Sequence, residues 1–210
     1  MGKADGVVMK NLNENGSIQS VFLRSENSYL IKAKPTTYAG CRFRSRLEAQ
    51  WAAFFDELSW DWEYEPFDLE KWAPDFSIRC FDANMLVEVK PIEWATNTER
   101  NNQIISQRPD LEKIKGQAVL ILGTSLIRTR AVNNFKPIDL ASIGVFVFAD
   151  GRKEHAVFRR CYGKRVSITS GYSKIGFQGV AYEDFQDPMT LSEMQFLWNS
   201  AKSKVQWNSD

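Results

Sequence analysis

A helical apolar stripe followed at once by strand-like segments limits most strongly the folds that this chain can adopt. Within residues 45–58, large apolar side chains recur at the spacing of one helix face: Leu47, Trp51, Phe54, Phe55 and Leu58. Such spacing is typical of an amphipathic α-helix. Ser45 is a suitable N-cap, and Glu48 follows three residues later, as in a capping box. We therefore predict a helix from Ser45 to Leu58 that buries one face.

Three strand patterns come directly after this helix. Residues 60–69 alternate apolar and polar side chains, residues 75–80 follow Pro74, and residues 85–90 end at Pro91. Alternation with a period of two is typical of half-buried strands. The sequence Asp82-Ala83-Asn84 between the last two segments is typical of a turn. These segments are therefore predicted to form three strands, the last two of which make an antiparallel hairpin.

The rest of the chain continues this mixed pattern. We predict a helix over 97–107, a strand buried on both faces over 117–122, a hairpin turning at Asp150-Gly151 and a C-terminal helix over 191–204. Residues 124–141 give no clear pattern. The order predicts an α/β protein with a mixed central β-sheet flanked by helices. Residues 1–37 are expected to form an N-terminal arm, 38–150 the core, and 151–210 a C-terminal extension made of a hairpin strand, an irregular segment and a helix.

Composition excludes several classes of function. The chain has a single histidine, His155, so zinc sites built from two or more imidazoles are excluded. Three widely spaced cysteines in 210 residues argue against a disulfide framework. No apolar run of about 18 residues and no secretory signal are found, so we expect a cytoplasmic protein with no membrane partner. If this chain does chemistry, carboxylates and lysine are the expected agents.

The strand over 86–90 carries the residues best suited to such chemistry. Because strand side chains alternate, Glu88 and Lys90 share one face while Val87 and Val89 share the other. Asp75 pairs with residue 88 if the hairpin is centred at 81.5, which lies at the expected turn. Asp75, Glu88 and Lys90 are therefore predicted to meet at one end of the hairpin.

Two carboxylates at such close range repel each other unless a cation lies between them. A divalent ion such as Mg²⁺ takes oxygen ligands, and the main-chain carbonyl of Val89 offers one more. Lys90 would lie beside the attacking water and the phosphate, an arrangement that suits phosphodiester hydrolysis. Glu48 lies at the edge of the buried helical stripe and is able to add a third carboxylate.

These residues resemble the motif of the PD-(D/E)XK nuclease superfamily. Pro74-Asp75 and Glu88-Val89-Lys90, preceded by a helix with Glu48, form that pattern, and residues 43–91 are closely similar to small phage and mobile-element proteins of the superfamily. The resemblance implies a restriction-endonuclease-like core with a four-stranded mixed sheet, Mg²⁺ or Mn²⁺ dependence, and DNA as substrate. It implies Asp75 and Glu88 as metal ligands and Lys90 as the catalytic lysine.

The same resemblance gives Glu48 the part of the helix-borne catalytic carboxylate and metal ligand. Many members place a functional glutamine on the helix after the lysine strand, and Gln103 and Gln107 both qualify by position. Transposon end-cleaving subunits of the superfamily also carry Val-Lys-Pro, as residues 89–91 do. Restriction, degradation of host DNA, recombination or repair, and cutting at transposon ends remain open as biological roles.

DNA contacts must come from local charge, because the net charge is only +1. Arg42, Arg44 and Arg46 are the candidates beside the predicted helix, and a second basic cluster consists of Arg159, Arg160, Lys164 and Arg165. A homodimer or a partner subunit would supply the second active site needed to cut both strands.

The leading interpretation is thus a Mg²⁺-dependent DNA endonuclease encoded by a phage or another mobile element and acting in its bacterial host cell. A non-catalytic DNA-binding or assembly subunit that keeps the nuclease fold is the alternative. Hydrolysis of another phosphate ester is a third hypothesis.

Overall fold

The computed structural model describes the chain over residues 10–12, 18–20, 33–68, 72–80, 83–95, 98–106, 118–133, 136–161, 165–170 and 185–206. The chain divides into two compact units, Met1–Lys32 and Ala33–Asp210. In the first unit, β1 (Lys10–Leu12) and β2 (Ile18–Ser20) form an antiparallel pair.

The second unit begins before residue 38, so the predicted boundary of the N-terminal arm was placed too late. β3 (Thr36–Tyr38) pairs with β4 (Cys41–Phe43) in a short hairpin. Ala39 and Gly40 both have positive φ, which closes this tight turn. Thr36 and Phe43 are buried, and this burial ties the hairpin to the second unit.

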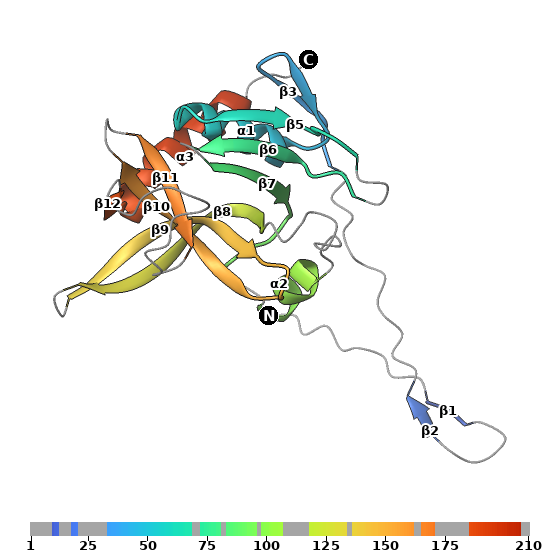
Figure 1. Cartoon of the computed structure of the whole chain (residues 1–210). Helices are drawn as coiled ribbons and strands as arrows, with labels where there is room; N and C mark the ends of the chain where they lie inside the picture. The colour runs from blue at the N-terminus through green and yellow to red at the C-terminus, as the bar shows by residue number, and fades with distance from the viewer. Residues whose placement is uncertain are drawn as a thin grey trace, which may run out of the picture. The chain divides into compact units, whose positions relative to one another are not determined.

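A mixed sheet forms the centre of the second unit (Figure 1). Its eight described strands run in the order β11-β10-β9-β8-β7-β6-β5, with β12 beside β10. All neighbours are antiparallel except β7 and β8, which are parallel. The bounds are β5 (Asp61–Tyr64), β6 (Phe76–Cys80), β7 (Ala83–Val89), β8 (Val119–Asn133), β9 (Lys136–Val147), β10 (Lys153–Cys161), β11 (Val166–Ser170) and β12 (Phe185–Pro188).

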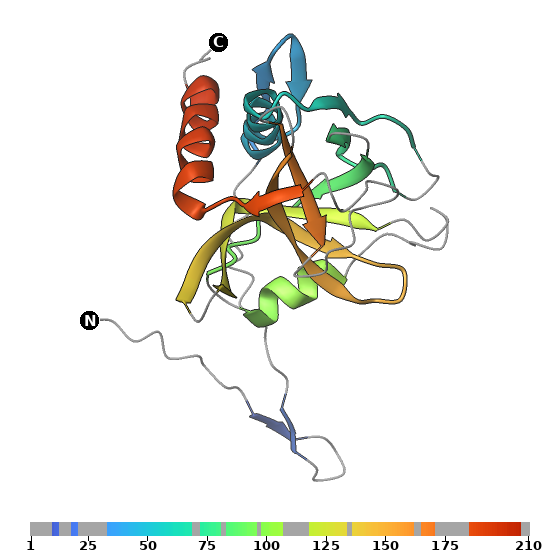
Figure 2. The same ribbon diagram turned by 60° about the vertical axis from the view of Figure 1, so that its left-hand side comes forward.

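Helices cover both faces of this sheet (Figures 1 and 2). α1 (Arg46–Glu57) and α3 (Leu191–Gln206) lie together on one face, where Trp51 and Trp198 contact each other at 4.3 Å between ring centroids. α2 (Thr98–Ser106) lies on the other face, where Ile105 belongs to a smaller apolar cluster. The predicted α/β architecture with a mixed sheet and flanking helices is therefore confirmed. No helix in the described residues is long and apolar enough to cross a membrane.

Local signals explain where the first elements begin and end. The helix predicted at Ser45 has Ser45 as its N-cap, with the hydroxyl accepting from the Glu48 N–H. The first strand is shorter than the predicted 60–69, because Glu65 adopts a positive φ of 48° directly after β5. Pro66 follows, and it has no N–H to donate to a ladder.

The C-terminal half differs most from the prediction. The unassigned stretch 124–141 continues β8 and β9 into a long antiparallel hairpin, in which Asn133 pairs with Lys136. Among the described residues of 151–210, β10, β11 and β12 belong to the central sheet. α3 joins the same core through its buried residues Met194, Trp198 and Ala201.

Candidate active site

The β6–β7 hairpin brings the predicted acidic residues together. Phe76 pairs with Val87, and Ser77 with Leu86, so each pair of residue numbers sums to 163. The same register, continued by one residue, sets Asp75 opposite Glu88, as the turn position predicted. Asp75 is only 3% exposed, and its Oδ2 accepts a 2.7 Å hydrogen bond from the main-chain N–H of Val89.

Glu88 and Lys90 share one face of β7. The Lys90 ammonium lies 2.5 Å from Glu88 Oε1, and Trp72 Nε1 donates to Glu88 Oε2 at 2.9 Å. The Glu88 side chain is buried, whereas the Lys90 side chain is 36% exposed. Lys90 is held by its backbone, because its N–H donates to the carbonyl of Leu122 on β8. A buried acid is thus paired with an amine that reaches solvent.

The environment of Asp75 opposes its negative charge. Burial, followed by the nearby charge of Glu88, raises the pKa of Asp75 to about 7, and Glu48 adds to this rise. The Val89 N–H and the Arg44 guanidinium act in the opposite direction. Burial is the largest cause of this rise, and repulsion by Glu88 and Glu48 is the part that a bound cation would relieve. Such a site favours the binding of an additional cation.

Glu48 reaches the same cluster from the first turn of α1. Its Oε1 accepts from the Ser45 hydroxyl at 2.9 Å, and its Oε2 accepts from Tyr64 Oη at 2.6 Å and from the Arg44 N–H at 3.1 Å. The burial of Tyr64 and its bond to Glu48 raise the pKa of the phenol. Glu48 is therefore a capping residue and also a member of the acidic cluster, two roles that the sequence left open.

Arg44 is the cation among these carboxylates. Its guanidinium forms an ion pair with Asp75, lies 3.1 Å from Glu65 Oε1, and lies 4.0 Å from Glu48 Oε2. The Arg44 side chain is nevertheless 57% exposed, so it is free to leave toward solvent. Arg44 and Lys90 offset part of the negative charge of the four carboxylates that they contact.

The donor set of the cluster suits a hard divalent ion. Asp75 and Glu88 offer carboxylate oxygens, and the Val89 carbonyl leaves the extended strand on the same side as its N–H, which points at Asp75. In the described part of the chain, no three His, Cys, Asp or Glu side chains are arranged to hold a metal ion. Arg44 and Lys90 each contact one carboxylate oxygen, of Asp75 and of Glu88 respectively, that a bound ion would use.

The other predicted residues lie in varied places. Gln103 is exposed on α2, and Gln107 falls outside the described residues. Arg42, on β4, and Arg46, at the start of α1, are exposed close to Arg44 in the chain. They remain available for DNA, unlike Arg44, which is engaged in the cluster.

The second basic cluster is partly committed to the fold. Arg160 forms an ion pair with Glu193 at 2.7 Å, which joins β10 to α3, and Arg159 donates to the Thr169 hydroxyl. Arg165 is exposed, and Lys164 lies outside the described residues. The first cluster is therefore the better candidate for phosphate contacts.

Sequence reasoning missed three partners of the cluster. Trp72 and Tyr64 donate to the two glutamates, and Arg44 binds Asp75 rather than standing as a surface charge. The alternation over residues 61–64 indicates which face Tyr64 takes. Nothing in the local pattern around residue 72 indicates that its indole reaches β7.

Comparison with protein-family models, with curated proteins and with solved structures gives no match.

Proposed function

We propose that this chain is a Mg²⁺- or Mn²⁺-dependent DNA endonuclease of the PD-(D/E)XK type, encoded by a phage or another mobile element. The observation that carries this proposal is the meeting of Asp75, Glu88 and Lys90 at one end of β7. Each is held there by a separate contact: Val89 N–H for Asp75, Trp72 for Glu88, and the β8 backbone for Lys90.

The order of elements supports the same assignment. α1, β5, β6, β7, α2 and β8 follow one another, and β7 and β8 run parallel beside two antiparallel neighbours. This arrangement agrees with the four-stranded mixed core and flanking helices implied by the resemblance to restriction-endonuclease-like proteins. The further strands β9 to β12 extend that core.

Each residue has a distinct part in the proposed reaction. A divalent ion held by Asp75, Glu88 and the Val89 carbonyl, with Glu48 as the helix-borne carboxylate, would supply positive charge at the scissile phosphate and activate water. Lys90 contacts Glu88 directly, and its part is to orient the attacking water and to stabilise charge that develops on the phosphate. The water oxygen adds to phosphorus, the bond from phosphorus to the leaving oxygen breaks, and the leaving oxygen takes up a proton.

A cleavage assay tests this proposal. Supercoiled plasmid is incubated with Mg²⁺, with Mn²⁺ and with EDTA, using wild type, Lys90→Ala and Glu88→Gln. Matched controls are Lys202→Ala and Glu63→Gln, whose side chains are exposed on α3 and β5. We expect metal-dependent cleavage that falls by about 100- to 10,000-fold in the two site variants and is unchanged in the controls.

Two outcomes would replace the proposal. If wild type and Lys90→Ala behave alike on plasmid with both metals, the non-catalytic DNA-binding or assembly subunit becomes the better interpretation. If nucleotides or other phosphate esters are hydrolysed while DNA stays intact, the chain is a phosphohydrolase of another kind.

A further inference from the structure

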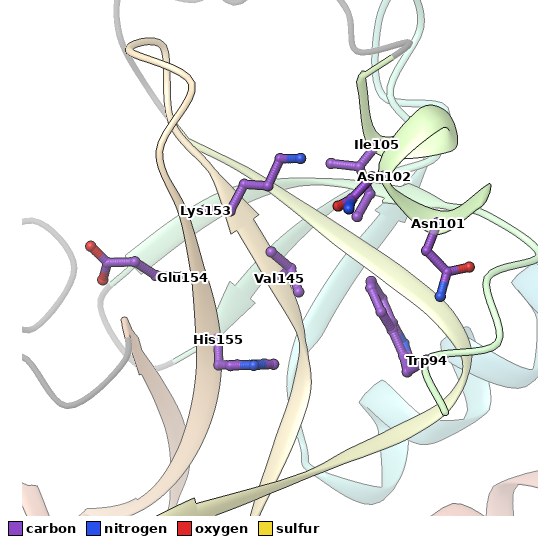
Figure 3. A pocket seen from close by; sticks show the side chains of 8 residues that line it. All are labelled: Trp94, Asn101, Asn102, Ile105, Val145, Lys153, Glu154 and His155. Carbon is purple, nitrogen blue, oxygen red and sulfur yellow. The ribbon is translucent and has the colours of Figure 1, made fainter. Parts of the chain in front are cut away.

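A cavity of about 290 Å³ lies between α2, the loop after β7 and the β9–β10 hairpin (Figure 3). Its walls combine two ring side chains, an amide, an amine and an apolar floor: Trp94, His155, Asn102, Lys153, Ile105 and Val145. In Figure 3, His155 points toward Trp94 from the opposite wall, whereas Glu154 points away from the cavity. No acidic side chain therefore points into the cavity from the residues that line it.

The cavity lies on the same face of the sheet as the acidic cluster. Glu88 pairs with Ile121, Ile121 with Val145, and Val145 with His155, which makes a continuous row across four strands. Directly paired residues project to the same face. Because neighbouring strands are about 4.8 Å apart, Val145 lies about 10 Å from Glu88 and His155 about 14 Å. This span matches a few nucleotides, given a rise of about 3.4 Å per base in a duplex strand.

Trp94 is fixed in a position that costs stability. Its indole N–H is buried and has no hydrogen-bond partner in the described structure. A buried donor without a partner opposes stability. The indole lies so close to Gly123 that a Cβ there would be 2.2 Å from Trp94 Nε1, so only glycine leaves room for the ring. Packing against Gly123 and the smaller apolar cluster therefore holds the Trp94 ring in a fixed position at the wall of the cavity.

The chemistry of the walls matches one ligand class. The Trp94 ring suits a flat heteroaromatic group, because nucleobases stack on aromatic side chains, and the His155 ring reaches toward it from the opposite wall (Figure 3). The Asn102 amide both donates and accepts, as the edge of a nucleobase requires. Lys153 has no ion-pair partner among the described residues and supplies positive charge for a phosphate.

We propose that this cavity binds one unpaired nucleotide of the DNA strand that is cut at the Glu88–Lys90 cluster. Trp94 stacks on its base, His155 contacts the base from the opposite wall, Asn102 contacts the base edge, and Lys153 contacts its phosphate. The inference rests on the proposed function and deepens it, because it makes DNA with an unpaired base near the cleavage position the preferred substrate.

Binding measurements separate this inference from catalysis. The catalytically silent Lys90→Ala protein is titrated, by fluorescence anisotropy in Ca²⁺, with three duplexes: one with a single unpaired adenosine, one fully paired, and one with an abasic site in place of that adenosine. We expect the unpaired adenosine to tighten binding about 5- to 100-fold over both other duplexes. Asn102→Ala and Lys153→Ala, added to Lys90→Ala, should remove most of this preference, whereas Lys202→Ala should leave it intact. Trp94→Leu should remove the preference for the unpaired adenosine as well. If the Trp94→Leu protein misfolds, Asn102→Ala and Lys153→Ala still test the proposal, because both side chains are exposed.

The outcomes distinguish the two proposals. Equal binding of all three duplexes overturns the nucleotide site, even if wild type cleaves DNA. A preference that depends on Asn102 and Lys153 supports the site, even if wild type cleaves nothing. Free dAMP that binds as tightly as the unpaired adenosine and is not displaced by that duplex would overturn the assignment to a DNA strand.

Discussion

The two faces of β7 lie in opposite environments. On one face, Met85, Val87 and Val89 join the large apolar core beneath α1 and α3. On the other, Glu88 is as buried as many core residues, yet its contacts are an amine and an indole N–H. Burial on the first face stabilises the fold through removal of apolar surface from water. Burial of a carboxylate opposes stability unless its charge is compensated, so the second face is maintained for another reason.

The strongest test of that difference is to substitute one residue on each face and to compare the effects on stability and on DNA cleavage. Val87→Ala should destabilise the protein by about 2 kcal/mol, because it removes two fully buried methyl groups, with DNA cleavage per folded molecule unchanged. Glu88→Gln should reduce cleavage by at least about 100-fold with little loss in urea stability. Chemical denaturation and plasmid cleavage, measured on both variants, check the pair. A Glu88→Gln protein that cleaves normally but unfolds readily would reverse the assignment of the two faces.

The substitution Asp75→Asn removes a charge that Glu88 repels. It should have a smaller effect, which appears in the melting temperature. The folded pKa of Asp75 is about 7, above the ordinary value of 3.8. The stability that this raised pKa contributes is therefore fully present below pH 3.8 and is lost as the pH rises through 7. In EDTA, Asp75→Asn should match wild type near pH 4 and exceed its melting temperature at pH 8 by about 5 °C.

Thermal melts at several pH values check this, with Asp61→Asn on the exposed β5 edge as the control. Excess Mg²⁺ should stabilise wild type at pH 8 and leave Asp75→Asn unaffected. A variant that melts below wild type at pH 8 in EDTA would show that the Arg44 ion pair outweighs the repulsion.

Local patterns were sufficient for the elements that build the acidic cluster. The apolar stripe of α1, with Ser45 before it, predicted where the helix begins. The alternation of residues 85–90, together with the turn centre, predicted that Asp75 lies opposite Glu88. The long β8–β9 hairpin was not predicted, because its pairing past Leu122 shifts register and residues 124–141 show no simple alternation. The positions of β10 to β12 depend on contacts distant in sequence, such as the pairing of Arg159 with Pro188. Arg44 in the cluster was missed for the same reason, since its partner Asp75 lies on another element.

The effect of Arg44 on metal binding can be measured without an activity assay. Its guanidinium competes with a divalent ion for Asp75, and its exposed position makes the ion pair worth about 1 kcal/mol or less. Arg44→Ala should therefore tighten Mn²⁺ binding up to about fivefold. Isothermal titration with Mn²⁺ checks this, with Arg79→Ala as the control, since Arg79 pairs with the exposed Asp61. Weaker Mn²⁺ binding by Arg44→Ala would contradict the competition and would make Arg44 a support for the ligands.

The exposed arginines beside the cluster should give the smallest effect. Arg42 and Arg46 flank Arg44 in sequence and are exposed, whereas Arg44 is engaged with carboxylates. If each contacts one phosphate, its substitution by alanine should lower the slope of log affinity against log salt by about 0.9. The measurement is DNA binding in Ca²⁺ between low and moderate salt, with the Lys90→Ala protein as background. Arg160→Ala is the matched control, because Arg160 is paired with Glu193. An unchanged slope in both variants, or an equal drop in the control, would remove these arginines from the DNA-contacting surface and leave that surface to be sought along the β8–β9 hairpin.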